Sequence, residues 1–215
     1  MGTNDLNTQP ILVGMGGHAL VVRELLESLG FSPKGYLDDS SGDDFAEKLP
    51  YLGSESSPEI QPLLREHPLC ITVGTNAIRA RLDEQLSSLG GQILEPIIHP
   101  TAYVSDSASL AAGTQVLPQA AVNARSVVGR CVIINTSAIV EHECQIGDYC
   151  HLAPGSVLAG NVTLGKSVFV GANASIIQGI KVGEKVIIGA GAVVIRDVPA
   201  GATVVGNPAR IIKLR

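Results

Sequence analysis

The feature that most constrains this chain is a period of six residues that runs without interruption from Ile98 to Val194. Every sixth residue is aliphatic, and the residue four places after it is small or β-branched. Neither the period of a helix nor that of an ordinary strand produces this pattern. A hexapeptide period predicts a parallel β-helix, in which each unit makes one short strand and one turn. The aliphatic side chains should then point inward.

Glycine often follows the aliphatic residue, and we expect it there because glycine adopts positive φ at no steric cost. The glycines at this position are Gly129, Gly147, Gly165, Gly171, Gly183 and Gly189. The whole pattern resembles the left-handed β-helix of the hexapeptide acyltransferases, which implies three hexapeptides, or 18 residues, per triangular coil. The segment from Gly206 to Ala209 resembles the cap that closes many of these transferases. We assign residues 97–215 to this domain.

Composition narrows the class of protein further. The chain has 215 residues, 45% of them hydrophobic, and a net charge of −5, which gives no support for nucleic acid or an anionic membrane as partner. The sequence contains no run of 18 apolar residues, so no membrane span is expected. Residues 1–8 are expected to form a loose tail, and the polar opening segment lacks the hydrophobic region of a signal peptide. The four cysteines show no CxxC spacing and predict reduced thiols in a cytoplasmic protein.

Residues 9–96 predict a Rossmann-like α/β domain with parallel strands. A short strand at residues 11–13 leads through a glycine-rich turn into a helix that ends at Gly30. Further strands are expected at Tyr36-Leu37 and at residues 69–73, followed by a helix with an apolar face. That face should contain Ile78, Leu82, Gln85 and Leu89. A last strand is expected over residues 93–98, leading directly into the repeats.

Three polar loops follow the strands of this domain and should meet at one edge of the sheet. Ligands of open parallel sheets bind beside the carboxyl ends of strands, and bare glycine amides at a helix start favour phosphate. The residues expected to bind substrate are Gly16, Gly17, His18, Asp38, Asp39 and Gly74. The alternative is that the glycines only permit close packing of strand and helix. A domain with a single mononucleotide-type half favours a nucleotide-sugar over a dinucleotide.

The turn from Gly14 to Ala19, together with Asp38-Asp39, resembles the N-terminal domain of one subfamily of bacterial hexapeptide transferases. These enzymes acetylate UDP-linked 4-amino-sugars or sialic acid with acetyl-CoA. Their motif matches this chain at Asn135, His142 and Glu143, and a downstream histidine matches at His151. The resemblance implies that His142 is the general base, oriented by Glu143, and that the amide of Gly160 stabilises the oxyanion. It also suggests acetyl-CoA contacts at Asn135, His151, Ala172 and Ala190.

Counting in coils of 18 residues places these positions relative to one another. His142 and Gly160 fall one coil apart at the same corner, whereas Asn135 and His151 fall on a different side of the prism. If all of them serve one site, that site lies between subunits, and a cyclic homotrimer is the natural assembly for a three-sided prism. A zinc site is disfavoured because a third histidine, His99, lies more than two coils from His142.

The expected function is acetyl-CoA-dependent N-acetylation of a nucleotide-linked 4-amino-4,6-dideoxy sugar, of the UDP-N-acetylbacillosamine type, in surface glycan biosynthesis. Direct transfer is expected, because no cysteine or serine forms an obvious nucleophile–base pair with His142. Three alternatives remain: O-acetylation of sialic acid, N-acetylation of a GDP-linked amino-sugar, and a non-catalytic scaffold that binds nucleotide-sugars.

Overall fold

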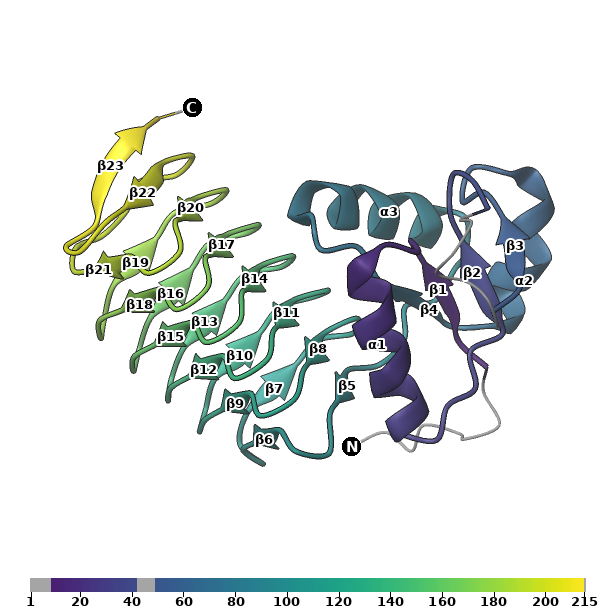
Figure 1. The fold of residues 1–215 in the computed structure, drawn as a ribbon, viewed down its shortest axis with the longest axis horizontal. Coiled ribbons are helices and arrows are strands. Elements are labelled where there is room, and N and C mark those ends of the chain that lie inside the picture. Colours follow the sequence, from purple (N-terminus) through teal and green to yellow (C-terminus); the bar gives the residue numbers. More distant parts are fainter. Residues whose placement is uncertain (1–8, 42–48, 215) are drawn as a thin grey trace. The chain divides into compact units, whose positions relative to one another are not determined.

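The chain divides into two compact units, Met1–Ile97 and Ile98–Arg215. The computed structural model describes residues 9–41 and 49–214, so the expected tail at residues 1–8 lies outside the described residues. Figure 1 shows the first unit as a small sheet with helices and the second as a stack of flat laps. Among the described helices, none has the length and hydrophobicity that crossing a membrane requires.

The first unit is built on a parallel four-stranded sheet in the order β3-β2-β1-β4. Its strands are β1 (Ile11–Val13), β2 (Gly35–Leu37), β3 (Tyr51–Gly53) and β4 (Leu69–Ile71). Its helices are α1 (Gly17–Ser28), the 3-10 helix η1 (Pro58–Ile60), α2 (Gln61–Glu66) and α3 (Asn76–Ser88). Strand β1 is buried along its whole length, as a strand covered on both faces must be. The predicted Rossmann-like parallel domain is confirmed.

Helix α1 follows from the spacing of its apolar residues. Val22, Leu25 and Leu26 recur at helical intervals and are buried. Gly30, just beyond the last turn, has φ +83°, a conformation that ends helices and that glycine adopts most readily.

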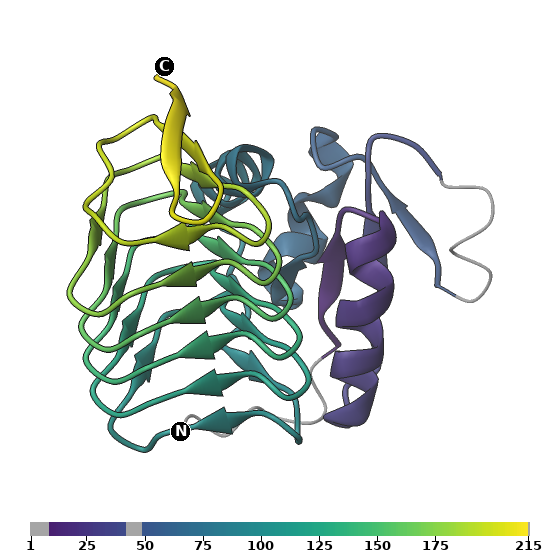
Figure 2. The ribbon, with the colours of Figure 1, turned by 60° about the vertical axis from the view of Figure 1, so that its left-hand side comes forward.

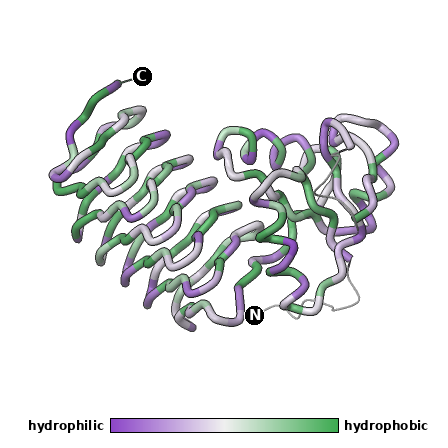
Figure 3. The backbone as a smooth tube through the Cα atoms, viewed as in Figure 1, coloured by the Kyte–Doolittle hydropathy of each residue, from purple (hydrophilic) through white to green (hydrophobic). Residues whose placement is uncertain are grey.

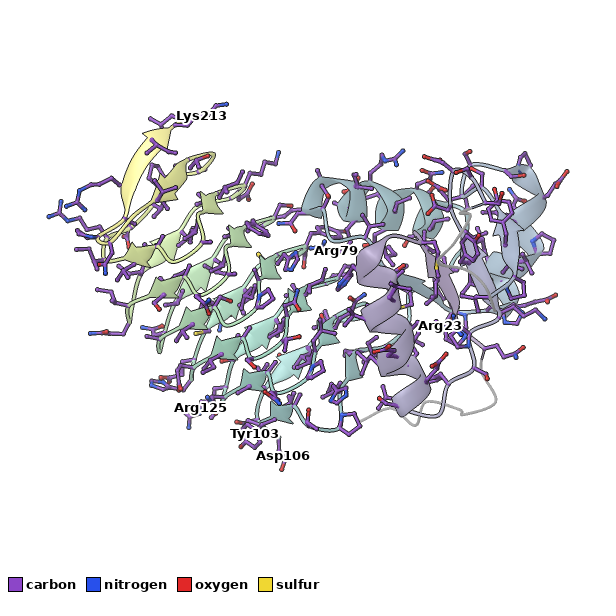
Figure 4. The ribbon with its side chains drawn as sticks, viewed as in Figure 1. Arg23, Arg79, Tyr103, Asp106, Arg125 and Lys213 are labelled. Carbon is purple, nitrogen blue, oxygen red and sulfur yellow. The ribbon has the colours of Figure 1, made fainter. Side chains whose placement is uncertain are left out.

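Two details expected for this unit are wrong, although α3 itself forms and Leu82 of its expected face is buried. The buried face of α3 consists of Arg79, Leu82, Asp83 and Leu86, while Ile78 is exposed. Arg79 (labelled in Figure 4) is fully buried, and its guanidinium donates hydrogen bonds to the carbonyl oxygens of Val73 and Gly74, at 2.9 and 3.0 Å. These bonds offset the cost of burying the charge and fix the loop after β4. Residues 93–98 do not form one strand, because Ile93 makes only an isolated bridge to Leu69. Strand β5 (Ile97–Ile98) pairs instead with the repeats.

The second unit is a parallel β-helix with three faces, which we number in the order the chain visits them. Face 1 contains β5, β8 (Gln115–Val116), β11 (Ile133–Ile134), β14 (His151–Leu152), β17 (Phe169–Val170), β20 (Ile187–Ile188), β22 (Thr203–Val205) and β23 (Arg210–Lys213). Face 2 contains β6 (Tyr103–Val104), β9 (Ala121–Val122), β12 (Ile139–Val140), β15 (Val157–Leu158), β18 (Ser175–Ile176) and β21 (Val193–Val194). Face 3 contains β7 (Ser109–Leu110), β10 (Val127–Val128), β13 (Gln145–Ile146), β16 (Thr163–Leu164) and β19 (Lys181–Val182).

From β6 to β21, each strand pairs with the strand 18 residues away on the neighbouring lap, as in Ile133 with His151 and Ile139 with Val157; the last pairing, Ile187 with Thr203, spans 16. The aliphatic positions point inward, and the small residues at the corners are equally buried, as Ala138 and Ala174 show at 0% exposure. The hydrophobic segments therefore recur on successive laps in Figure 3, and the laps stack in register in Figure 2. The predicted hexapeptide-repeat parallel β-helix is confirmed.

The role expected for the repeat glycines is wrong. Gly147 and its equivalents do not have positive φ; that conformation falls two residues later, often on non-glycine residues such as Tyr149 (φ 58°) and Asn173 (φ 55°). A Cβ on Gly147 would lie 2.7 Å from the backbone nitrogen of Lys166, on the next lap. Glycine is needed here because the backbones of adjacent laps approach too closely for a side chain.

The last lap is closed by a hairpin, in which β23 runs antiparallel to β22. The connecting segment is fixed to β21, because the amide of Val193 donates to the carbonyl of Gly206 and the amide of Ala209 donates to the carbonyl of Val193. Figure 2 shows the hairpin at the C-terminal end of the stack. Ala209, in the connecting segment, packs against the hydrophobic interior, whereas β23 itself is exposed.

Candidate active site

The turn between β12 and β13 carries a histidine–carboxylate pair. Nδ1 of His142 lies 3.2 Å from Oε2 of Glu143. A carboxylate only accepts hydrogen bonds, so Nδ1 carries the proton in this pair and the lone pair of Nε2 faces away from Glu143. The two side chains are 59% and 52% exposed, which leaves the imidazole accessible to another molecule.

Arg125 extends the pair, with its guanidinium 3.8 Å from the other carboxylate oxygen of Glu143. Its side chain reaches outward from the preceding lap (labelled in Figure 4) and is 77% exposed. A pair as exposed as this contributes little to stability.

The His142 ring lies against Gly160, which occupies the same corner one lap further on. A Cβ on Gly160 would be 2.5 Å from Nε2 of His142, so a side chain at this position would displace the ring. The amide of Asn161 donates to the carbonyl of His142 at 2.8 Å and ties the two laps together. Within residues 9–41 and 49–214, the amide N–H of Gly160 has no hydrogen-bond acceptor. A base and an unused amide donor are therefore neighbours.

A second polar pair lies elsewhere on the β-helix. The side-chain amide of Asn135, in the turn after β11, donates to Nε2 of His151 in β14 at 3.1 Å. The His151 ring also packs in a T-shaped arrangement with the ring of Phe169 on the next lap, with ring centroids 5.3 Å apart. These contacts hold the His151 imidazole in a fixed orientation.

The predicted catalytic and coenzyme-binding residues thus divide between two edges of one chain. His142, Glu143 and Gly160 lie at the edge between faces 2 and 3. Asn135, Ala172 and Ala190 all lie in turns at the edge between faces 1 and 2, and His151 lies on face 1 beside them. One chain does not bring the two groups together.

The neighbourhood of His142 offers neither a metal site nor an activated thiol among the described residues. No group of three His, Cys, Asp or Glu side chains suited to a metal ion is found in the described part of the chain. Cys144, two residues after His142, is buried, and burial raises the pKa of its thiol. Its Sγ donates to the carbonyl of Ala159 at 3.3 Å, inside the β-helix. It is not an available nucleophile in this arrangement.

The first unit contains a cavity of about 340 Å³ at the carboxyl ends of its strands. All six residues expected to bind substrate line it: Gly16, Gly17, His18, Asp38, Asp39 and Gly74. The Asp38 carboxylate has a structural task, because it accepts hydrogen bonds from the amides of Met15 and Asp39, both at 2.7 Å. It therefore holds the glycine-rich turn against the end of β2.

Several residues of this cavity escaped the sequence reasoning. They include Glu55, Thr72, Ile78 and Arg81. Glu55 follows β3, a strand of only three residues that no pattern indicated. The sequence holds only a two-residue resemblance: Tyr51-Leu52 repeats the Tyr36-Leu37 pair of β2, and Glu55 comes three residues after Leu52, whereas Asp38 follows Leu37 directly.

A β-helix with a histidine–carboxylate pair beside an unused amide, joined to a Rossmann-like unit, defines the class of hexapeptide acyltransferases. Two family models match the chain: the PglD N-terminal domain at residues 10–86, and the bacterial transferase hexapeptide (six repeats) at residues 125–160 and 161–196.

Known proteins narrow the class. GDP-perosamine N-acetyltransferase of Escherichia coli O157:H7 is 37% identical over 66% of this chain and 66% of its own length. UDP-N-acetylbacillosamine N-acetyltransferase of Bacillus subtilis is 39% identical over 49% of this chain and 50% of its own length. The aligned regions thus span about two thirds and half of these relatives.

Solved structures match nearly the whole chain. A histidine-to-alanine variant of GDP-perosamine N-acetyltransferase from Caulobacter crescentus, in complex with CoA and GDP-perosamine, has a TM-score of 0.89 and 36% identity over 96% of this chain and 98% of its own. The acetyltransferase domain of PglB from Neisseria gonorrhoeae, in complex with acetyl coenzyme A, has a TM-score of 0.87 and 37% identity over 96% and 100%. This chain belongs to the hexapeptide-repeat sugar N-acetyltransferases with a PglD-type N-terminal domain.

Proposed function

We propose that this protein transfers the acetyl group of acetyl-CoA to the amine of a nucleotide-linked 4-amino-4,6-dideoxy sugar, in a cytoplasmic step of surface glycan biosynthesis. The observation that carries the proposal is the His142 imidazole, paired with Glu143 and lying against Gly160. The relatives that act on GDP-perosamine and UDP-N-acetylbacillosamine support the acceptor class. The buried free cysteines agree with a reducing compartment.

The chemical step needs one base and one donor. The sugar nitrogen attacks the thioester carbonyl and forms the C–N bond, while Nε2 of His142 takes the proton from nitrogen. Glu143 holds the proton on Nδ1 and stabilises the imidazolium that results. The tetrahedral intermediate then loses the CoA thiolate as the C–S bond breaks, and the imidazolium returns the proton to sulfur. Atoms and charge balance without a metal or a covalent enzyme intermediate.

Gly160 supplies the electrostatic part of catalysis in this proposal. Its free N–H lies beside the base, where the thioester oxygen gains negative charge in the intermediate. Removing one such donor typically reduces kcat by about 10²- to 10³-fold.

The N-terminal cavity is the proposed nucleotide site. The amides of Gly16 and Gly17 open helix α1 and suit the diphosphate, with His18 and Gly74 beside them. The carboxylate of Asp39 suits the ribose hydroxyls. Asp38 can also accept from them through the lone pairs that the loop amides do not use.

A homotrimer completes the proposed acetyl-CoA site. Because Asn135, His151, Ala172 and Ala190 lie at a different edge from His142, a neighbouring copy must supply them. The amides of Ala172 and Ala190 have no acceptor among the residues described here, and they recur on successive laps at one corner, as contacts along an extended pantetheine arm would. Rotation by a three-fold axis brings one such edge against the other in every interface.

The function is tested by incubating the full chain with acetyl-CoA and four acceptors: a GDP-linked and a UDP-linked 4-amino-4,6-dideoxy sugar, free sialic acid, and a 4-hydroxy sugar nucleotide. We expect mass spectrometry to show one added acetyl group on an amino-sugar nucleotide alone. Acetylation of sialic acid alone would assign the protein to O-acetylation. Absence of any acetyl-CoA binding in calorimetry would identify a scaffold.

His142→Ala tests the proposed base. Loss of general base catalysis should lower kcat by about 10²- to 10⁴-fold, while the Kd of acetyl-CoA stays nearly unchanged. His99→Ala is the matched control, because His99 is hydrogen-bonded to Thr101 in the first lap of the β-helix, more than two laps from His142, and this variant should retain full kcat. A parallel loss of coenzyme binding and kcat in His142→Ala would contradict the assignment.

A further inference from the structure

One carboxylate in the N-terminal cavity has an oxygen that no described residue satisfies. Glu55 is only 7% exposed and lines the cavity. Its Oε2 is buried and, within the described part of the chain, has no hydrogen-bond partner. A buried polar atom without a partner costs about 1–3 kcal/mol, so native structures rarely keep one without a reason.

The backbone around Glu55 is held in place. The side-chain amide of Gln85, on helix α3, donates to the carbonyl of Glu55 at 3.1 Å. The amide of Ser57 donates to the carbonyl of Ser54, which closes a turn around the residue. The terminal torsion of a glutamate is broad, so this fixed backbone still lets either carboxylate oxygen turn toward a ligand.

The order of the strands gives Glu55 a definite place along a bound nucleotide. The glycine-rich turn follows β1, Asp38 and Asp39 follow β2, and Glu55 follows β3, in the spatial order β1-β2-β3. Neighbouring strands lie roughly 5 Å apart. With phosphates at the turn and ribose at the aspartates, the next group along an extended nucleotide is the base. Glu55 therefore stands where the base lies.

The chemistry of a carboxylate distinguishes between bases. An ionised carboxylate presents two acceptors and no donor. The Watson–Crick edge of guanine presents two adjacent donors, N1–H and the 2-amino group, whereas uracil presents one N–H between two carbonyl oxygens that a carboxylate repels. Adenine and cytosine each pair a donor with an acceptor at this edge. Only guanine offers a donor to each oxygen of Glu55.

We infer that Glu55 is the specificity-determining residue of the nucleotide site and that it selects a guanine nucleotide over a uracil one. The inference rests on the proposed function and deepens it by naming the nucleotide. The relatives include enzymes for both GDP- and UDP-linked sugars, so similarity to them does not distinguish the two nucleotides.

The charges around Glu55 agree with this role. Burial, and then the charges of Asp39 and Asp38, raise the pKa of its carboxyl, while its own backbone amide and Arg81 lower it. The free site therefore disfavours the ionised form. Two N–H donors from a base would satisfy the carboxylate oxygens and favour ionisation.

The test is calorimetric titration of the full chain with GDP, IDP, ADP and UDP. IDP differs from GDP only by lacking the 2-amino group, so it removes one of the two proposed hydrogen bonds. We expect GDP to bind about 10-fold more tightly than IDP and about 100-fold more tightly than UDP, the range of a bidentate contact.

Two variants identify the residue responsible. In Glu55→Gln, one acceptor becomes a donor that opposes the 2-amino group, so GDP should lose its advantage over IDP while UDP binding stays within about 2-fold. Glu59→Gln is the matched control, because it removes the same charge from an exposed residue that does not line the cavity. Circular dichroism checks that both variants fold.

Each outcome decides the question. UDP binding as tight as GDP, or an equal loss of all four nucleotides in Glu55→Gln, would overturn the inference. If Glu55→Gln does not fold, the ratio of GDP to IDP binding in the unaltered protein decides alone. Acetylation of a UDP-linked but not a GDP-linked amino-sugar would overturn the inference and leave the proposed function intact. A failure to acetylate any amino-sugar would instead overturn the function.

Discussion

At the scale of single residues, the turn that holds Gly160 shows that a site can require glycine where the fold does not. The equivalent position one lap earlier is His142 and one lap later is Gln178. The turn itself therefore accepts a side chain, and the φ of Gly160 is not positive. Only the imidazole of His142 requires glycine at 160, because it occupies the space of the missing Cβ.

Gly160→Ala should therefore impair catalysis and leave stability almost unchanged. The new Cβ displaces the imidazole from the amide, so we expect kcat to fall by about 10²-fold or more. The Tm from differential scanning calorimetry should stay within about 2 °C of the original. Gln178→Ala, at the same turn position, is the control and should change neither quantity. A large fall in the Tm of Gly160→Ala would mean that the fold itself needs this glycine.

Glu55 should make stability depend on pH in the free protein. Because burial raises the pKa of its carboxyl, the folded chain binds more protons than the unfolded chain between the two pKa values. The contribution of Glu55 to stability is thus fully present below the unfolded pKa of about 4.3 and is lost as pH rises through the folded pKa.

Glu55→Gln removes that dependence. Its Tm should exceed that of the unaltered protein at about pH 8, and the difference should shrink toward about pH 4. Calorimetric melts without nucleotide across this range measure the effect, with Glu59→Gln for comparison. A difference in Tm that is constant across the range would show that ionisation of Glu55 has no part in it.

At the scale of the repeat, each lap uses two kinds of turn position with different requirements. Gly147 lies where adjacent backbones approach, and a Cβ there would lie 2.7 Å from the nitrogen of Lys166. Gly191 has φ +67° with open space around it, and Asn173 occupies the equivalent place one lap earlier with φ 55°. A side chain at Gly147 would collide with the backbone of the next lap, whereas the second position accepts residues that tolerate positive φ.

We therefore expect opposite results from two glycine replacements. Gly147→Ala should lower the free energy of unfolding by about 1–3 kcal/mol, because the laps must separate to admit the methyl group. Gly191→Asn should change it by less than about 1 kcal/mol, since asparagine adopts this conformation readily. Denaturant titration measures both. Equal losses would indicate that φ, and not the approach of the laps, governs the repeat.

At the scale of the whole molecule, the division of the proposed site between two edges makes assembly part of the function. His142 and Gly160 lie at one edge, and Asn135 and His151 belong to another. A site formed between copies is complete only when one copy supplies the first group and its neighbour supplies the second.

Mixed assemblies test this directly. His142→Ala and the double variant Asn135→Ala/His151→Ala should each be nearly inactive alone. When the two are unfolded and refolded together at equal concentration, about a quarter of the interfaces combine two intact halves, so about a quarter of the original activity should return. Each variant refolded by itself is the control. Persistent inactivity of the mixture would show that both groups act from the same chain.

The sequence by itself determined the β-helix and its register, because a six-residue period allows only one assignment of inward positions. It also placed the three polar loops at one edge of the N-terminal sheet, since parallel strands deliver their carboxyl ends to the same side. His142 and Gly160 could be paired by counting, because a solenoid converts a fixed separation in sequence into contact between neighbouring laps.

Only the tertiary structure decided the features that depend on packing between distant segments. The burial of Arg79 depends on carbonyl groups in the preceding loop, and the need for Gly147 depends on the backbone of the next lap. Glu55 became visible only when β3, too short to show a pattern, was placed beside β2. Periodicity reports which way a side chain points, but it does not report what lies opposite, and that was the information missing at each of these residues.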